Sequence, residues 1–251
     1  MLYNSDWYWG LMIPSMFISP FLFLYFLGKH SLSKSDLLGE VLSVLIVAWL
    51  GSLVVAKLDF WFDPTVTITP SLKNYFHLFF QGQRWDGALL FSLLYILGWL
   101  GRKMKVSEHL RFTDSATLTI CFLYCIGKVG CFLAGHNSEC SGTVSNLPWA
   151  VHLPNLPNTY HPRQIYDSLF HLVLFFVLFY VYKRKLKFHG EITLIYLIVS
   201  PVYCFFSEYL SYNPKILFGL ASGQIIDIII LIIGVSFIGY KYQKHKTELI
   251  V

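Results

Sequence analysis

The stretch ATLTICFLYCIGKVGCFLA, residues 116–134, is an almost uninterrupted apolar run that carries one basic residue, Lys128. A helix that crosses the hydrocarbon core of a bilayer needs about 20 mainly apolar residues, and this run is close to that length. A charged side chain inside such a helix is energetically expensive, so it indicates a functional role by default. We therefore expect a membrane-spanning helix with a functional cation.

Six further apolar runs fill the chain, which is 55% hydrophobic, 18% aromatic and only 13% charged. This composition is typical of a membrane protein and not of an ordinary soluble domain. We predict an all-α integral membrane protein with seven transmembrane helices, in a single membrane domain that covers residues 1–251. The expected helices are residues 7–27, 37–56, 87–101, 116–134, 165–181, 192–210 and 225–240.

Basic residues are concentrated in alternate connections and in the C-terminal tail. Short loops with an excess of Lys and Arg stay on the cytoplasmic side. Thirteen of the nineteen basic residues follow this pattern: Lys29, Lys34, Arg102, Lys103, Lys105, Arg111, Lys183, Arg184, Lys185, Lys187, Lys241, Lys244 and Lys246. We therefore expect the N-terminus outside and the C-terminus in the cytoplasm. Because these residues are dispersed, the net charge of +5 does not indicate nucleic-acid binding.

Several polar side chains fall at the same outer depth once the direction of each helix is fixed. They are Asp86, Lys128, Gln164, Asp167, Glu208, Gln224 and Asp227. Together they would line a polar cavity at the level of the lipid head groups, open to the extracytoplasmic side. The alternative is that each lies at a helix end and extends to the interface. For Lys128 we prefer head-group binding over a structural salt bridge to Glu208.

Four stretches in the C-terminal half resemble one family, the prolipoprotein diacylglyceryl transferases. GKVGCFLAG, residues 127–135, resembles the family signature G-R-[IVL]-G-[NC]-F-x-[NA]-G. LPWAV follows at 147–151, and HPRQIYDSLF at 161–170 is similar to the family's H-P-[ST]-Q-L-Y-E. FGLASGQIIDI, residues 218–228, resembles the G-Q segment that opens the last helix. Their order and spacing also match.

The resemblance implies seven helices with the N-terminus outside, in the bacterial plasma membrane, and an active site on the extracytoplasmic side. It also implies a reaction in which the diacylglyceryl group of phosphatidylglycerol moves to the thiol of a lipobox cysteine. The partners would be a membrane phospholipid and a prolipoprotein signal peptide or another lipid acceptor. The reaction needs a cation for the phosphate and an acceptor for the thiol proton.

The chain departs from the family pattern at its expected cations and histidine. Lys128 replaces the signature arginine and keeps the charge without the bidentate fork of a guanidinium. Cys131 replaces the following asparagine, and the histidine expected at the third helix falls at Trp85 or Asp86. The sixth-helix arginine, four residues before a glutamate, falls at Cys204.

We assign candidate roles on this basis. The proton acceptor is Asp86, His136 or His161, and the sequence does not choose among them. The substrate-binding candidates are Lys128, Gly130, Cys131, Arg163, Gln164, Asp167, Glu208 and Gln224. The segment HNSEC, residues 136–140, matches no standard zinc spacing, so we expect no metal and no cofactor. A disulfide between Cys131 and Cys140 is an open alternative.

Two other functions fit parts of the pattern. The missing arginines favour a non-catalytic lipid-binding relative, or a diverged transferase with another donor or acceptor. The acidic residues Asp86, Asp167, Glu208 and Asp227 would also suit a cation carrier, but no inverted repeat of broken helices supports that class.

Overall fold

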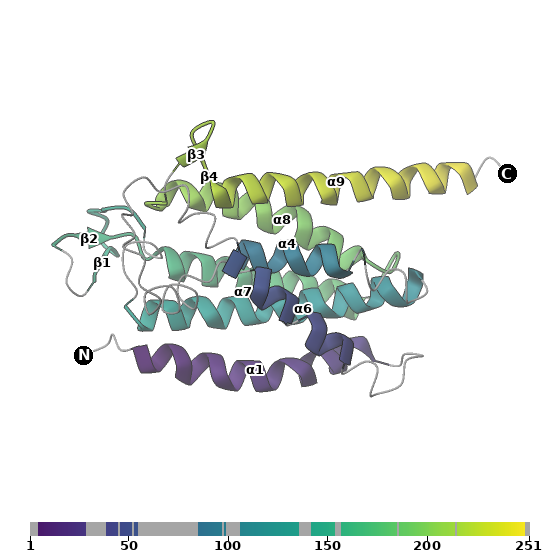
Figure 1. Ribbon diagram of the computed structural model, residues 1–251, viewed down its shortest axis with the longest axis horizontal. Coiled ribbons are helices and arrows are strands. Elements are labelled where there is room, and N and C mark those ends of the chain that lie inside the picture. The colour runs from purple at the N-terminus through teal and green to yellow at the C-terminus, as the bar shows by residue number, and fades with distance from the viewer. Residues whose placement is uncertain are drawn as a thin grey trace. The chain divides into compact units, whose positions relative to one another are not determined.

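The computed structural model describes residues 5–28, 39–54 without 45 and 52, 85–98 without 97, 106–135, 142–153, 157–184, 186–213 and 215–248. The described chain is mainly helical (Figure 1). Its helices are α1 (Ser5–Leu27), α4 (Trp85–Tyr95), α6 (Val106–Leu133), α7 (Arg163–Lys183), α8 (Glu191–Ser207) and α9 (Ser222–Glu248), with the 3-10 turn η2 (Glu208–Leu210). The strands are β1 (Val151–His152), β2 (Thr159–Tyr160), β3 (Lys215–Leu217) and β4 (Leu220–Ala221).

Three segments in the described part are long and apolar enough to cross a membrane. They are Glu108–Leu133, Arg163–Lys183 and Glu191–Leu210, and each contains most of an expected transmembrane run. Shorter apolar helices cover Ile13–Leu27, Gly39–Gly51 and Ser222–Phe237. The chain is therefore a mostly helical membrane protein.

Helix α6 begins ten residues before the apolar run that indicated it, at Val106 instead of Ala116. Its first turns contain polar residues such as Thr113, Asp114 and Ser115, and all three are buried. Hydropathy detects only the part of a helix that faces hydrocarbon, whereas backbone hydrogen bonds extend the helix through polar residues as well.

The chain forms two compact units. The first contains residues 1–29, 110–213 and 231–251, and the second contains residues 30–109 and 214–230. Helix α6 and helix α9 each contribute residues to both units, and all contacts below lie within one unit or the other.

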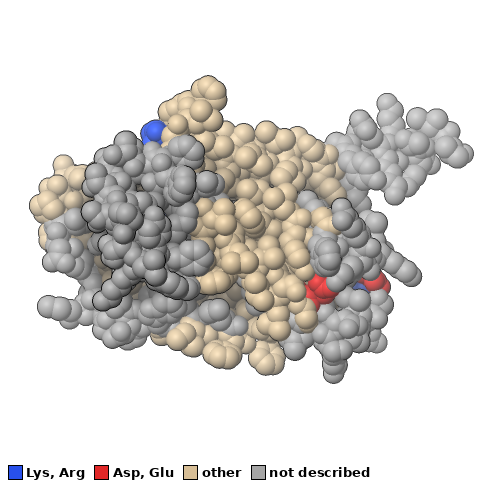
Figure 2. Space-filling view, in the orientation of Figure 1, with Lys and Arg blue, Asp and Glu red and all other residues tan. Residues whose placement is uncertain are grey.

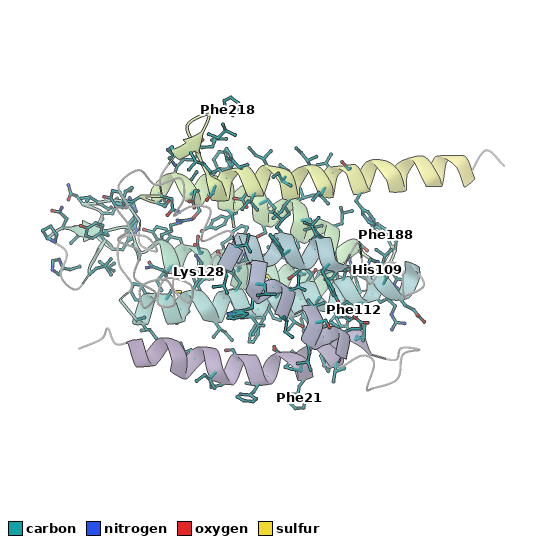
Figure 3. All side chains as sticks on the ribbon, viewed as in Figure 1. Phe21, His109, Phe112, Lys128, Phe188 and Phe218 are labelled. Atoms are coloured by element: carbon teal, nitrogen blue, oxygen red, sulfur yellow. The ribbon has the colours of Figure 1, made fainter. Side chains whose placement is uncertain are left out.

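In the first unit, aromatic side chains join α1 to α6 and α7, which run side by side (Figure 1). The ring of Phe23 lies 4.8 Å from that of Phe112 in an edge-on contact, and Phe26 lies 5.6 Å from Tyr182. Figure 3 shows Phe112 directed into this packing and Phe21 directed away from it. On the other side of the unit, Gly234 of α9 packs closely on Leu197 of α8, where an added Cβ would lie 3.2 Å from the Leu197 carbonyl oxygen.

The connection between α7 and α8 is fixed by buried polar contacts. The carboxylate of Asp114, on α6, accepts hydrogen bonds from the backbone N–H groups of Gly190 and Thr193 at 2.7 and 2.9 Å, and from the Thr193 hydroxyl at 2.9 Å. These bonds satisfy N–H groups that the first turn of a helix leaves unpaired. Arg184 and Glu191 form an ion pair at 2.5 Å across the same turn.

In the second unit, the helical segment 39–51 packs closely on α4. A Cβ at Gly51 would lie 2.4 Å from the Cβ of Phe91, so only glycine fits at this contact. Tyr95 donates a hydrogen bond to Glu40 at 3.4 Å. The antiparallel strands β3 and β4 form a hairpin whose turn, Phe218 and Gly219, has positive φ at both residues.

Many large apolar side chains on the helices are exposed, including Phe21 at 73%, Val173 at 63% and Phe176 at 59%. The face drawn in Figure 2 is covered mainly by uncharged side chains wherever its residues are described. In a membrane protein such side chains face lipid, so the exposed apolar surface agrees with the composition.

Candidate active site

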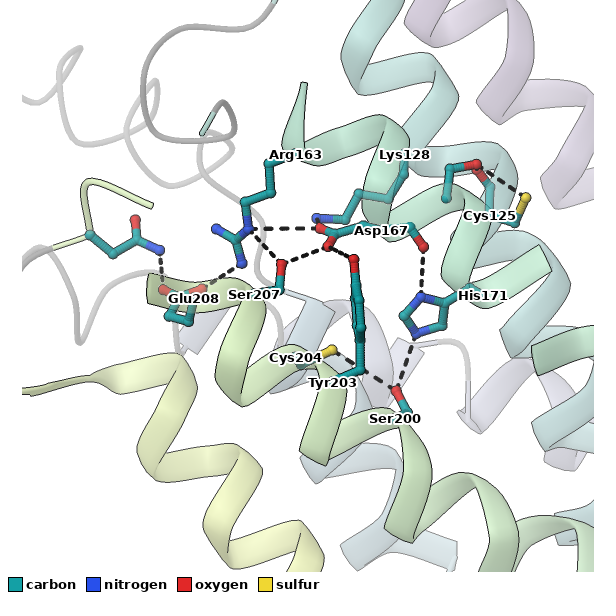
Figure 4. A network of polar contacts seen from close by, with 12 residues as sticks. Cys125, Lys128, Arg163, Asp167, His171, Ser200, Tyr203, Cys204, Ser207 and Glu208 are labelled. Carbon is teal, nitrogen blue, oxygen red and sulfur yellow. Dashed lines mark hydrogen bonds and ion pairs between the residues drawn. The ribbon is translucent and has the colours of Figure 1, made fainter. Parts of the chain in front are cut away.

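Lys128, near the end of α6, forms an ion pair with Asp167 of α7 (Figure 4). The Nζ atom of Lys128 lies 2.8 Å from Oδ2 of Asp167. The Asp167 side chain is 2% exposed and that of Lys128 is 22% exposed, so the lysine is the more accessible partner. A buried carboxylate needs such a partner because an unpaired charge in a low-dielectric interior is expensive.

Arg163, the first residue of α7, joins the same carboxylate to a second one. Its Nε lies 3.9 Å from Asp167 Oδ2, and its Nη2 donates to Glu208 Oε2 at 2.6 Å. Asn213 donates from its side-chain amide to the other oxygen of Glu208. The four charged side chains therefore form an alternating chain of two cations and two anions: Lys128, Asp167, Arg163 and Glu208.

Neutral side chains of α8 complete the surroundings of Asp167. The Ser207 hydroxyl donates to Asp167 Oδ1 at 2.8 Å and accepts a hydrogen bond from Arg163 Nε at 3.0 Å. The Tyr203 hydroxyl donates to the same Oδ1 at 3.1 Å, and its ring stacks on Phe170 at 3.7 Å. Asp167 is thus held by α6, α7 and α8 together.

His171 lies one helical turn below Asp167 and is fully buried. Its Nδ1 donates to the Asp167 carbonyl oxygen at 2.8 Å, because a carbonyl can only accept. Its Nε2 lies 3.1 Å from the Ser200 hydroxyl of α8. On the α6 side, the Tyr124 ring lies 4.0 Å from the imidazole and 5.2 Å from Lys128 Nζ.

His161 precedes α7 and is held by its own neighbours. Its Nδ1 lies 3.3 Å from the Tyr166 hydroxyl, which accepts a hydrogen bond from the Trp149 indole at 2.7 Å. Gly142 approaches closely enough to donate its N–H to the His161 carbonyl at 3.0 Å, and a Cβ there would lie 2.8 Å from that oxygen. This contact brings the loop after α6 onto the start of α7.

Electrostatically, the cluster can bind an anion only by rearranging. Both cations already face carboxylates, and their charges balance. A phosphate oxygen that reached Lys128 and Arg163 would replace Asp167 Oδ2, the atom on which the two cations converge. Such paired cations can stabilise a phosphate whose charge increases as a bond to it breaks.

Comparison with known proteins identifies the family. The family model described as prolipoprotein diacylglyceryl transferase matches residues 4–240. The chain belongs to this family. All of the site residues named above lie inside the matched range, and the chain is a membrane transferase of this family.

Relatives named phosphatidylglycerol–prolipoprotein diacylglyceryl transferase align along most of the chain. The protein of Clostridioides difficile is 25% identical over 97% of this chain and 93% of its own length. That of Campylobacter hominis is 24% identical over 96% of this chain and 88% of its own length. The protein of Finegoldia magna is 35% identical, but the alignment covers 58% of this chain and 57% of that protein.

The structure brings together four of the sequence-predicted residues, Lys128, Arg163, Asp167 and Glu208. Gln164 is buried beside Arg163, while Gly130 and Cys131 follow Lys128 on α6. Gln224 lies in the second unit, where its Oε1 accepts the Ala221 N–H at 3.0 Å. Asp86 belongs to α4, but its side chain lies outside the described part, as do His136 and the whole segment 136–140.

Within the described residues, no group of three or more His, Cys, Asp and Glu side chains is placed to hold a metal ion. The disulfide alternative involves Cys140, which lies outside the described residues.

Sequence reasoning missed Ser207, Tyr203 and His171. Ser and Tyr are too common in membrane helices to signal a site by themselves. A signal for His171 was present, because Arg163, Asp167 and His171 recur every four residues and therefore share one face of a helix. In this transferase that face is polar from the start of α7 into its third turn.

Proposed function

We propose that this transferase moves the diacylglyceryl group of phosphatidylglycerol to the lipobox cysteine thiol of a prolipoprotein. The observation that carries the proposal is the convergence of Lys128 and Arg163 on a single oxygen of Asp167. Two cations at that spacing suit one phosphate group. The names of the relatives support the donor and the acceptor.

Arg163 supports this proposal further, because it supplies a guanidinium at a position where the family pattern has Ser or Thr. The family's sixth-helix arginine is Cys204 here, four residues before Glu208. The Arg163 guanidinium reaches Glu208 from α7 at 2.6 Å. A guanidinium beside this carboxylate is therefore retained, although it comes from another helix.

The proposed reaction is a displacement at the glyceryl carbon that bears the phosphate. The thiol sulfur forms a bond to that carbon, the bond from carbon to phosphate oxygen breaks, and glycerol phosphate leaves. The thiol gives its proton to Asp86, His136 or His161, which remain the proposed acceptors. Lys128 and Arg163 offset the charge that develops on the leaving phosphate. Gly130, Cys131 and Gln164 are proposed to line the bound lipid, and Gln224, in the second unit, stays a proposed substrate-binding residue.

We also propose seven transmembrane helices with the N-terminus outside, the C-terminus in the cytoplasm and the site in the outer half of the bacterial plasma membrane. The basic loops support this direction. The residues Lys128, Arg163 and Glu208 share one end of α6, α7 and α8, and Lys183 and Arg184 lie at the other. Reporter fusions to each terminus would test the direction, and a cytoplasmic N-terminus would overturn it.

The function is tested with purified protein in nanodiscs that contain phosphatidylglycerol, together with a lipobox peptide. We expect the peptide to gain the mass of one diacylglyceryl group. The gain should fall by about 100-fold in Lys128→Ala and Arg163→Ala proteins, the usual effect of removing a group that stabilises transition-state charge. Lys183→Ala, a basic residue at the other end of α7, is the matched control and should react normally.

Two results would overturn the proposal. Folded protein that gives no mass gain would instead be a lipid-binding relative without turnover, or a transferase for another donor or acceptor. Normal turnover by both alanine variants would remove Lys128 and Arg163 from the site.

A further inference from the structure

The β3–β4 hairpin has an unusual residue in its turn. Phe218 and Gly219 connect the strands and have φ angles of 51° and 74°. Positive φ at both residues of a two-residue turn is the signature of type I′, in which Asn-Gly and Gly-Gly are strongly preferred. Phenylalanine resists this backbone conformation because its Cβ is crowded there. The chain therefore keeps an aromatic side chain at a position where local geometry disfavours it.

Burial of the Phe218 side chain among the described residues does not offset this unfavourable backbone conformation. Phe218 is 91% exposed, more than the other large apolar side chains of the described residues. Figure 3 shows it projecting from the hairpin. The neighbouring Leu217 is 51% exposed, and Lys215 at the base of the hairpin is also exposed. The tip is thus an apolar point with a basic residue beside it.

The hairpin lies close to the membrane because it is directly followed by the apolar helix α9. Strand β4 ends at Ala221, and α9 begins at the next residue with an apolar helix that covers Ser222–Phe237. Phe218 is four residues before that helix, so a fully extended chain would place it within about 15 Å of the helix start. Ile228 and Ile229 in the first turns of α9 are also exposed.

We infer that the β3–β4 hairpin is a membrane anchor. Phe218 and Leu217 are inserted among the lipid chains, and Lys215 faces lipid phosphates. Aromatic side chains are favoured at the membrane interface, and a basic side chain is attracted to anionic head groups. The anchor fixes the depth of the start of α9. Gln224, whose side chain is bonded to Ala221 at the end of the hairpin, would be held at that depth.

Photo-crosslinking in nanodiscs tests the anchor directly. Benzoylphenylalanine is placed at Phe218 of the full chain, and adducts with phospholipid are detected from the mass of the intact protein. Val173, 63% exposed in the middle of α7, is the control on an apolar helix, and Asn158, exposed in the turn before β2, is the control outside the helices. We expect lipid adducts at positions 218 and 173 and none at 158.

A lipobox signal peptide is added in a second arm. Adducts at position 218 to the peptide in preference to lipid would overturn the inference and make the hairpin a peptide-docking site. Absence of lipid adducts at 218 would also overturn it. Neither result depends on catalysis, so the anchor and the proposed function fail or succeed separately.

Two variants separate the anchor from the turn. Phe218→Asn should form a better type I′ turn but lose the anchor, while Phe218→Trp should keep the anchor. In nanodiscs, amide hydrogen exchange of residues 215–221 should be about tenfold faster in the Asn protein than in the Trp protein, as expected for losing burial of one aromatic side chain. Equal or slower exchange in the Asn protein would show that the turn alone orders the hairpin.

Discussion

Arg163 and Glu208 are 45 residues apart in the sequence and 2.6 Å apart in the structure. Their ion pair joins the start of α7 to the end of α8 at the point where the site residues meet. Both side chains are largely buried, so each partner protects the other from the penalty of an unpaired buried charge.

A double-mutant cycle measures this pair. Arg163→Met and Glu208→Met should each lower the free energy of unfolding by about 3 kcal/mol, because each leaves the other buried charge without its closest ionic partner. The double variant should lose less than the sum, with a coupling of about 1–3 kcal/mol. Denaturant titration in detergent gives all four values. Strict additivity would mean that the two side chains do not interact.

Moving the guanidinium back to α8 should rescue its loss from α7. Arg163→Ser should lower turnover by about 100-fold, since it removes one of the two cations. The second substitution Cys204→Arg places a guanidinium four residues before Glu208 on the same helix, within side-chain reach. We expect the double variant to recover most of the activity in the lipobox-peptide assay.

The matched control for that rescue is Arg163→Ser with Cys204→Met, which fills similar space without charge. Recovery in both double variants would attribute the rescue to packing. Recovery in neither would mean that the position of Arg163 on α7, and not only its charge, is required.

Gly142→Ala should disturb the site through the backbone of His161. An alanine Cβ would lie 2.4 Å from the His161 Cβ and 2.8 Å from its carbonyl oxygen, so the start of α7 must move. We expect a loss of about 1–3 kcal/mol in stability from overpacking. Displacement of Arg163 should lower turnover by up to about 100-fold.

Gly10→Ala in α1 is the control for this change, because nothing lies within 4 Å of the added Cβ. The stability of that variant in thermal unfolding and its turnover in the peptide assay should be close to those of the unmodified protein. Normal turnover by Gly142→Ala would show that the loop after α6 does not position the site.

Asp114 stabilises the start of α8 from outside that helix. Asp114→Ala removes three hydrogen bonds at once and should lower stability by about 2 kcal/mol. Thr193→Val removes the hydroxyl contacts with Asp114 and Thr117 but keeps both backbone hydrogen bonds to Asp114, so it should have a smaller effect. Unfolding in detergent compares the two, and an equal loss in both variants would contradict the capping role of the carboxylate.

Hydropathy located the helices that carry the site. The apolar runs at 165–181 and 192–210 lie within the spans Arg163–Lys183 and Glu191–Leu210, because both depend on the length of chain that hydrocarbon can cover. Lys128, Asp167 and Glu208 were expected at one level from the sequence, and in the structure they belong to one cluster of ion pairs, which Arg163 completes.

The partners of these residues did not follow from sequence. The alternative considered for Lys128 was an ion pair with Glu208, whereas the described ion pair is with Asp167, and Glu208 binds Arg163. Depth along a helix is set by residue number, but the direction of a side chain around the helix depends on how neighbouring helices are rotated and packed. The sequence did not predict Ser207 and Tyr203 as site residues for the same reason.

The fixed turn between α7 and α8 has a mechanical consequence. The Arg184–Glu191 ion pair joins α7 to α8 at one end, where Asp114 also holds the start of α8 against α6, so the two helices resist separation at that end. If a lipid is to enter between α7 and α8, they must separate at the opposite end. At that end the Arg163–Glu208 ion pair joins the two helices, and the positive charge of Arg163 that forms this pair is the same charge that a phosphate would attract.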